Sequence, residues 1–281
     1  MTKKEVLKRY NNVERIEKGG QKLVYKGVDK EGRVLALKFI ANPADRRVLQ
    51  EITLVQSLEL DNVPKIFESN VVFDEGVDEN VLFIVEEFID GCTLRKFLKD
   101  GNRFDLKQAY EATHSLLEIE MVLEEKRIIH RDIKPENIIL DHNGKIYLID
   151  FGIAKMLDGE SLTATEALHG PHTPGYVPME QYNNVKSAQD VRTDLFAIGV
   201  TIYEACSGYN PFRKNAINAE QVMANTVSVI PQELKLNGDT NGYFSRYIGM
   251  LMGKKQSQRP SSAKIAMEYL ESIRPTLNFG E

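Results

Sequence analysis

The spacing of apolar residues changes near residue 90, and this change limits the folds that the chain can adopt. Before that point, strand-like runs at Val24–Val28 and Val34–Ile40 flank a turn at Asp29–Gly32, a pattern that predicts a β-hairpin. Beyond it, apolar residues recur at three- and four-residue steps, as they do in helices that pack against a core. The chain is therefore predicted to be an α+β protein, in which a small antiparallel sheet precedes a larger, mainly helical part.

The other elements follow from the same two patterns. Two more strands are expected at Lys65–Phe73 and Val81–Phe88, with a polar turn between them at Asp74–Asn80. One main helix, Arg46–Leu58, is expected beside the sheet. The helices expected in the second part are Asp105–Glu125 with Asp105 as its cap, Asp190–Ser207, and a last helix that is capped by Ser261 or Ser262 and ends before Pro275.

Composition argues against several classes of function. The chain has 281 residues, of which 42% are hydrophobic and 27% charged, as in ordinary globular proteins. Its net charge of -5 gives no bulk attraction to nucleic acid or to an anionic membrane. The basic start has no apolar segment behind it, and Glu86, Glu87 and Glu204 interrupt the longest apolar runs, so neither a signal peptide nor a membrane span is expected. Cys92 and Cys206 are expected to be buried, reduced thiols, which suits a cytoplasmic protein.

A run of polar residues in the second part indicates the chemistry. It reads His130-Arg131-Asp132-Ile133-Lys134-Pro135-Glu136-Asn137, and after strand-like Ile138–Leu140 and Ile146–Ile149 comes Asp150-Phe151-Gly152. This order resembles the catalytic loop and the Asp-Phe-Gly element of the protein kinase family, and the resemblance extends from about Tyr10 to about Ile273. It implies a bilobal protein kinase fold with residues 1–281 as one domain, 1–89 as the N-lobe and 90–281 as the C-lobe. The compact loops look most similar to bacterial, eukaryotic-type (Hanks-type) serine/threonine kinases.

The resemblance implies a role for each polar residue. Charge in phosphoryl transfer is spread over oxygen atoms, so positioned carboxylates, amides and cations suffice for catalysis. Asp132 would orient the substrate hydroxyl and accept its proton, and Lys134 would neutralise the moving phosphoryl group. Asn137 and Asp150 would bind a Mg²⁺ ion that bridges the phosphates of ATP. Because Lys134 is typical of the serine/threonine branch, the expected substrates are Ser and Thr residues of proteins, including the chain itself.

The first part is expected to bind ATP. Lys38 would contact phosphate, and Glu51, on the expected helix, would be its ion-pair partner. The other contacts implied by the resemblance are backbone groups near Glu87 and Ile89 for adenine, the apolar side chains of Val24, Ala36 and Ile139 around the purine, and Ile16, Gly19 and Gly20 in the lid over the phosphates.

Two features of this part depart from the family pattern. Glu17 and Lys22 stand where glycines usually let backbone amides approach the phosphates, so Glu17 is expected to weaken ATP binding and Lys22 to compensate in part. Glu86 falls at the back of the purine pocket, where an apolar residue or threonine is usual. A carboxylate there needs a partner or partial hydration, and the sequence does not indicate which.

The segment Thr173–Glu180 resembles the part of the family's activation segment that docks the polypeptide substrate. The resemblance places Thr173 against the catalytic loop and pairs Glu180 with Arg259. Asp194 matches a residue of the helix that anchors the backbone of the catalytic loop. These matches favour a substrate that is itself a protein.

Arg131 directly precedes the expected base, and such an arginine can be ordered by a phosphate on the activation segment. We therefore hypothesise that Thr163 or Thr165 is autophosphorylated. Two alternatives stay open, because Glu166 could supply a permanent negative charge instead, and the loop could also be unmodified.

Other functions compete with this interpretation. The incomplete glycine loop and Glu86 are compatible with a pseudokinase that binds a nucleotide or a partner without transferring phosphate. A small-molecule phosphotransferase would use a similar aspartate and asparagine, but it would not need a segment that docks polypeptide. A protein-interaction role could coexist with catalysis and leaves no mark in the sequence.

Overall fold

The computed structural model describes residues 1–18, 22–41, 52, 60–150, 173–183 and 189–280, and the chain divides into two compact units. Among the described residues, Met1–Asp90 form the first unit and those from Gly91 onward form the second. The two units are described in turn.

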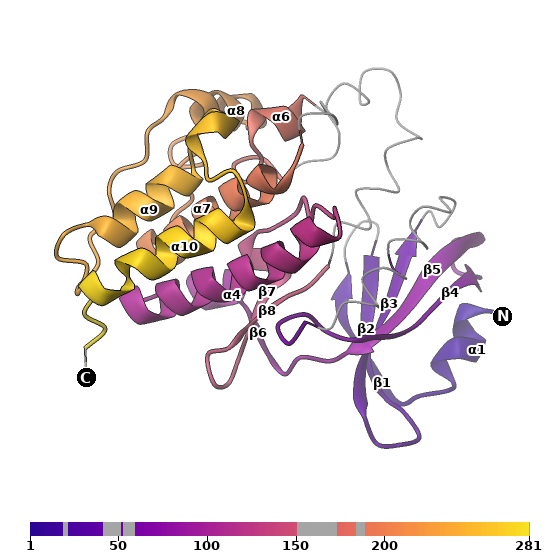
Figure 1. Cartoon of the computed structure of the whole chain (residues 1–281). Helices are drawn as coiled ribbons and strands as arrows, with labels where there is room; N and C mark the ends of the chain where they lie inside the picture. The colour runs from indigo at the N-terminus through magenta and orange to yellow at the C-terminus, as the bar shows by residue number, and fades with distance from the viewer. Residues whose placement is uncertain (19–21, 42–51, 53–59, 151–172, 184–188, 281) are drawn as a thin grey trace. The chain divides into compact units, whose positions relative to one another are not determined.

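The described part of the first unit is built on a five-stranded antiparallel sheet with the order β1-β2-β3-β5-β4 (Figure 1). Its strands are β1 (Asn11–Lys18), β2 (Lys22–Val28), β3 (Val34–Ala41), β4 (Ile66–Asp74) and β5 (Glu79–Glu87). The predicted hairpin and the two further strands are confirmed, with ends shifted by one or two residues. β1 was not predicted, because its polar sequence NNVERIEK lacks the apolar alternation of a half-buried strand.

The register of this sheet assigns side chains to its two faces. Val24 on β2 lies opposite Lys38 on β3, and Ala36 on β3 lies opposite Glu86 on β5. Directly paired residues share a face, as do residues two apart on one strand, so these four side chains lie on the same face. The other face carries an apolar core that includes Val6 of the short helix α1 (Lys3–Leu7), together with Leu35, Leu37, Phe39, Val72, Val81, Phe83 and Val85.

The helix expected at Arg46–Leu58 lies outside the described residues except for Ile52, which is helical and fully buried. Glu51, Gly19 and Gly20 also lie outside them. Their expected roles therefore remain predictions.

The second unit is mainly helical. Its α-helices are α3 (Leu94–Lys99), α4 (Leu106–Glu125), α6 (Met179–Tyr182), α7 (Val191–Ser207), α8 (Ala219–Ser228), α9 (Tyr243–Leu251) and α10 (Ala263–Ile273). The apolar helix α7 packs against α4, α9 and α10, and α4 and α10 run side by side (Figure 1). The second unit also contains a small antiparallel sheet of β6 (Gly91–Thr93), β7 (Ile138–Asp141) and β8 (Ile146–Leu148). Its described 3-10 turns are η1 (Pro135–Asn137), η3 (Gln256–Gln258) and η4 (Arg274–Thr276).

Side-chain caps fix the starts of the three helices that were predicted for the second unit. Asp105 accepts a hydrogen bond from the Gln108 amide and forms a capping box with that residue. Asp190 caps α7, and Ser262 rather than Ser261 caps α10. The α+β class and all three helix starts are therefore confirmed.

Two further expectations concern membranes and thiols. No helix in the described part of the chain combines enough length with enough apolar character to cross a membrane. Cys92 and Cys206 both carry free thiols, and both are half-buried rather than buried as predicted.

Candidate active site

The carboxylate of Asp132 is the centre of a polar group in the second unit. The Asn137 amide nitrogen donates to the backbone carbonyl of Asp132 at 2.8 Å and to its Oδ2 atom at 3.0 Å. The Lys134 Nζ atom lies 2.9 Å from the same Oδ2 atom and donates to the Thr173 hydroxyl at 3.0 Å. The Thr173 hydroxyl in turn lies 3.4 Å from Oδ1 of Asp132. Thr173 therefore contacts the catalytic loop as the sequence predicted, and two candidate catalytic residues and one candidate metal ligand lie together.

A buried carboxylate on α7 holds the backbone of this loop. Asp194 is fully buried and accepts the amides of His130 at 2.7 Å and Arg131 at 2.8 Å. Arg131 and Asp150 have φ angles of 67° and 59°, in the left-handed region that non-glycine residues seldom occupy. Burial raises the pKa of Asp194 to about 7, while the two amide hydrogen bonds act in the opposite direction. The predicted anchoring role of Asp194 is confirmed.

Asn137 and Asp150 are the candidate magnesium ligands. Asn137 is buried at the end of η1, and its carbonyl accepts the amide of Ile149 at 2.9 Å, which ties the loop to the residue before Asp150. Among the described residues no group of three or more His, Cys, Asp and Glu forms a self-contained metal site. An amide and a carboxylate nevertheless fit Mg²⁺, which prefers oxygen ligands and takes most of them from phosphates and water.

Several contacts fix the docking segment Thr173–Glu180. The Arg213 Nε atom donates to the carbonyl of Pro174 at 2.8 Å, and the Gln181 amide donates to the carbonyl of Arg131 at 2.8 Å. Glu180 pairs with Arg259 at 2.5 Å, as predicted, and the Arg259 side chain is fully buried. The segment is thus fastened both to the catalytic loop and to the helical core.

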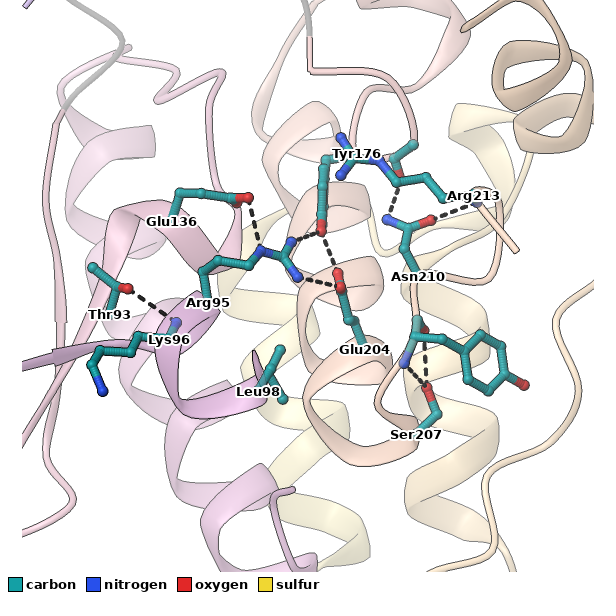
Figure 2. Close-up of polar contacts among 12 residues, drawn as sticks. Thr93, Arg95, Lys96, Leu98, Glu136, Tyr176, Glu204, Ser207, Asn210 and Arg213 are labelled. Atoms are coloured by element: carbon teal, nitrogen blue, oxygen red, sulfur yellow. Dashed lines mark hydrogen bonds and ion pairs between the residues drawn. The ribbon is translucent and has the colours of Figure 1, made fainter. Parts of the chain in front are cut away.

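A second polar cluster, which the sequence did not predict, surrounds Arg95 on α3 (Figure 2). Its guanidinium lies 2.8 Å from Glu136 in the catalytic loop, 2.6 Å from Glu204 on α7, and 2.5 Å from the hydroxyl of Tyr176 in the docking segment. Tyr176 also donates to Glu204. Burial and the nearby Glu204 charge raise the pKa of Tyr176, so its hydroxyl keeps its proton. The signal that could have revealed this cluster is Glu204, a charge that follows the apolar run Leu195–Tyr203 on α7 and, where it is buried, must have a partner.

In the first unit, Lys38 is the candidate phosphate ligand. It is 5% exposed on β3, and its Nζ atom lies 2.5 Å from Oε1 of Glu86. Val24 and Ala36 are buried on the same face of the sheet, whereas Ile16 is 49% exposed on β1. Lys38 is therefore a partner of the Glu86 carboxylate.

The remaining candidates are distributed between the units. The Glu87 amide already donates to the Lys65 carbonyl at 2.8 Å, so Glu87 has only its carbonyl to offer an adenine ring. Ile89 is buried, and Ile139 is half-buried on β7 of the second unit. Thr163 and Thr165 lie outside the described residues.

Comparisons of the chain with known proteins identify the family to which it is similar. The model of the protein kinase domain matches residues 10–270. A probable serine/threonine-protein kinase of Clostridium perfringens is 27% identical over 277 residues, which are 96% of this chain and 39% of that protein. Serine/threonine-protein kinase PrkC of Bacillus subtilis is 29% identical over 74% of this chain and 32% of its own length. The probable serine/threonine-protein kinase PknB of Lactococcus lactis is 31% identical over 73% of this chain and 32% of its own length.

A solved structure supports the same relationship at the level of the fold. The crystal structure of Rad53 in complex with AMP-PNP matches with a TM-score of 0.71 and 20% identity, over 94% of this chain and 65% of that one. The chain spans between 32% and 39% of the length of the three curated relatives above. Since the family model covers nearly all of the chain, the chain belongs to the protein kinase domain family.

Proposed function

We propose that this chain transfers the γ-phosphate of ATP to serine or threonine hydroxyls of proteins. The observation that carries the proposal is the group formed by Asp132, Lys134, Asn137 and Thr173, in which a carboxylate, a cation and an amide converge beside the docking segment. The names of the relatives support the serine/threonine class. We also propose that residues 1–281 are one kinase domain, with lobes 1–89 and 90–281.

In this mechanism Asp132 orients the substrate hydroxyl and accepts its proton as the oxygen attacks the phosphorus. Asn137 holds the Asp132 carboxylate in place, and Lys134, 2.9 Å from it, offers a cation to the transferred group. A magnesium ion bound by Asn137 and Asp150 would neutralise phosphate charge. Thr173 places the docking segment against this group, which favours a polypeptide substrate over a small molecule.

The nucleotide contacts that we propose come mainly from the first unit. Lys38 binds phosphate, and the predicted contributions of Glu51, Ile16, Gly19 and Gly20 complete the phosphate side. The carbonyl of Glu87 and the backbone of Ile89 bind adenine, and Val24, Ala36 and Ile139 surround the purine. The support for this assignment is that Val24, Ala36 and Lys38 share one buried face of the sheet.

We further propose autophosphorylation at Thr163 or Thr165 and a cytoplasmic location. Among the described residues, the buried Nε atom of Arg131 has no hydrogen-bond partner, as expected for a guanidinium that awaits an anion. Free thiols at Cys92 and Cys206 suit a reducing compartment.

The test is transfer of labelled phosphate from ATP·Mg²⁺ to a generic protein substrate and to the chain itself. Asp132→Asn should lower the rate by about a thousandfold, because the amide cannot accept the proton. Asp100→Asn, an exposed position at the end of α3, is the matched control and should change nothing. ATP binding without any transfer by the unsubstituted chain would contradict the proposal and favour a nucleotide-binding pseudokinase.

A further inference from the structure

The buried pair of Lys38 and Glu86 follows from the register of the sheet. Lys38 lies opposite Ile84 and Ala36 lies opposite Glu86, so Glu86 is the diagonal neighbour of Lys38 on the same face. Such neighbours are within reach of long side chains, and here the two charged atoms are 2.5 Å apart. The contact is thus set by two rigid strands and does not depend on a loop.

Both members of the pair are removed from water. The side chains of Lys38 and Glu86 are 6% and 11% exposed. Charges at such depth interact strongly, because little water screens them. As a unit the pair has no net charge, whereas an isolated lysine at the same place would be a full cation.

This neutralisation has a consequence for the binding of an anion. Lysine has three N–H donors, so Lys38 can contact Glu86 and a phosphate at the same time. The phosphate, however, meets a cation whose charge is already balanced by a carboxylate that also repels the phosphate. A residue at this position without charge would remove this carboxylate, and the attraction of Lys38 for the phosphate would be stronger.

We infer that Glu86 is a positioning residue that acts through Lys38: it fixes the ammonium group within the sheet and lowers the affinity of this chain for nucleotide phosphates. The inference rests on the proposed function, since it takes Lys38 as the phosphate ligand. It explains how a carboxylate is tolerated at a position where the family usually has an uncharged residue. It also identifies a determinant of nucleotide affinity outside the glycine loop.

The test compares ATP·Mg²⁺ with adenosine, which has the same base and sugar but no phosphate. Glu86→Gln removes the charge and keeps the shape, so it should tighten the binding of ATP by about tenfold and leave that of adenosine unchanged. Glu86→Met also removes the charge at similar volume and should likewise tighten the binding of ATP but not of adenosine. It replaces Glu86→Gln in the test if the glutamine variant folds poorly. Glu79→Gln, an exposed position on the same strand, is the matched control and should alter neither ligand. Isothermal titration calorimetry measures both affinities.

The other outcomes contradict the inference in distinct ways. Equal tightening of ATP and adenosine would show that Glu86 acts through the shape of the purine pocket. Unchanged or weaker ATP binding would show that the charge of Glu86 does not oppose phosphate. Neither result bears on phosphate transfer by the unsubstituted chain, so the proposed function would stand. Absence of ATP binding by the unsubstituted chain would overturn the proposed function and this inference together.

Discussion

In the first unit Lys38 is paired by a residue on the adjacent strand, whereas in the second unit Arg95 is held by groups from three separate segments. The contact between Lys38 and Glu86 joins two strands in register. The Arg95 cluster needs α3, the catalytic loop, α7 and the docking segment to be in place together (Figure 2). This difference predicts how the free energy of unfolding responds to substitution. Replacing both Lys38 and Glu86 by apolar residues should restore most of the stability that the single substitution removes, whereas replacing two members of the Arg95 cluster should not.

The largest effect is expected in the Arg95 cluster. Arg95→Met leaves Glu204, which is 6% exposed, without its cation, and should lower the free energy of unfolding by about 4 kcal/mol. The double variant Arg95→Met/Glu204→Met should recover little, because Glu136 and the Tyr176 hydroxyl also lose their partners. Urea unfolding of both variants measures this.

The adjacent residue provides a control for this experiment. Lys96→Met lies on the same helix and replaces a lysine whose side chain is 67% exposed, so stability should change by less than about 0.5 kcal/mol. Full recovery of stability in the Arg95→Met/Glu204→Met variant would show that the cluster behaves as a simple pair.

A smaller effect with the opposite pattern is expected for the pair in the first unit. Lys38→Met removes the cation beside the buried carboxylate of Glu86 and should cost about 3 kcal/mol of unfolding free energy. Lys38→Met/Glu86→Met replaces both charges by apolar side chains and should restore most of that loss, although it can no longer bind phosphate through Lys38. The measurement is again urea unfolding, without nucleotide. A double variant as unstable as Lys38→Met would show that the loss of stability in Lys38→Met does not come from the buried carboxylate of Glu86.

These two regions also show what the sequence could reveal. The pairing of Glu180 with Arg259 and the contact of Thr173 with the catalytic loop were predicted because both belong to a pattern that the protein kinase family shares. The helix starts were predicted because a cap depends on a few neighbouring residues, as at Asp105. Local and family-wide signals therefore predicted the long helices α4, α7 and α10 and the contacts of the docking segment, but not the shorter helices α3, α6, α8 and α9.

The remaining contacts depend on information that a single sequence lacks. Arg95 and Glu204 are 109 positions apart, and no local pattern connects two such residues. The partner of Glu86 became evident only with the register of β3 and β5, because a shift by one residue would have turned Glu86 to the other face. Strand β1 was missed because its side chains are mostly polar and exposed.

The smallest expected effect concerns a buried carboxyl group that, unlike Glu86 and Glu204, has no cation beside it among the described residues. Glu120 on α4 is fully buried, and neither of its carboxyl oxygens has a hydrogen-bond partner in the described part of the chain. Burial, reinforced by the charges of Asp194 and Glu124, raises its pKa well above the usual 4.5. The native protein therefore keeps a proton that the unfolded chain releases, and stability falls as pH rises above about 4.5.

Glu120→Met should consequently stabilise the chain, and the gain should depend on pH. At pH 5 the variant removes only the cost of burying an unsatisfied polar group, about 1 kcal/mol. At pH 8 it also removes the cost of protonating that group on folding, so the gain should be larger. Urea unfolding at the two pH values measures the difference, with the half-exposed Glu118→Met on the same helix as the control. An equal gain at both values would show that Glu120 does not take up a proton on folding, and a loss of stability would show that the native protein gives its carboxyl group a partner, such as a buried water molecule.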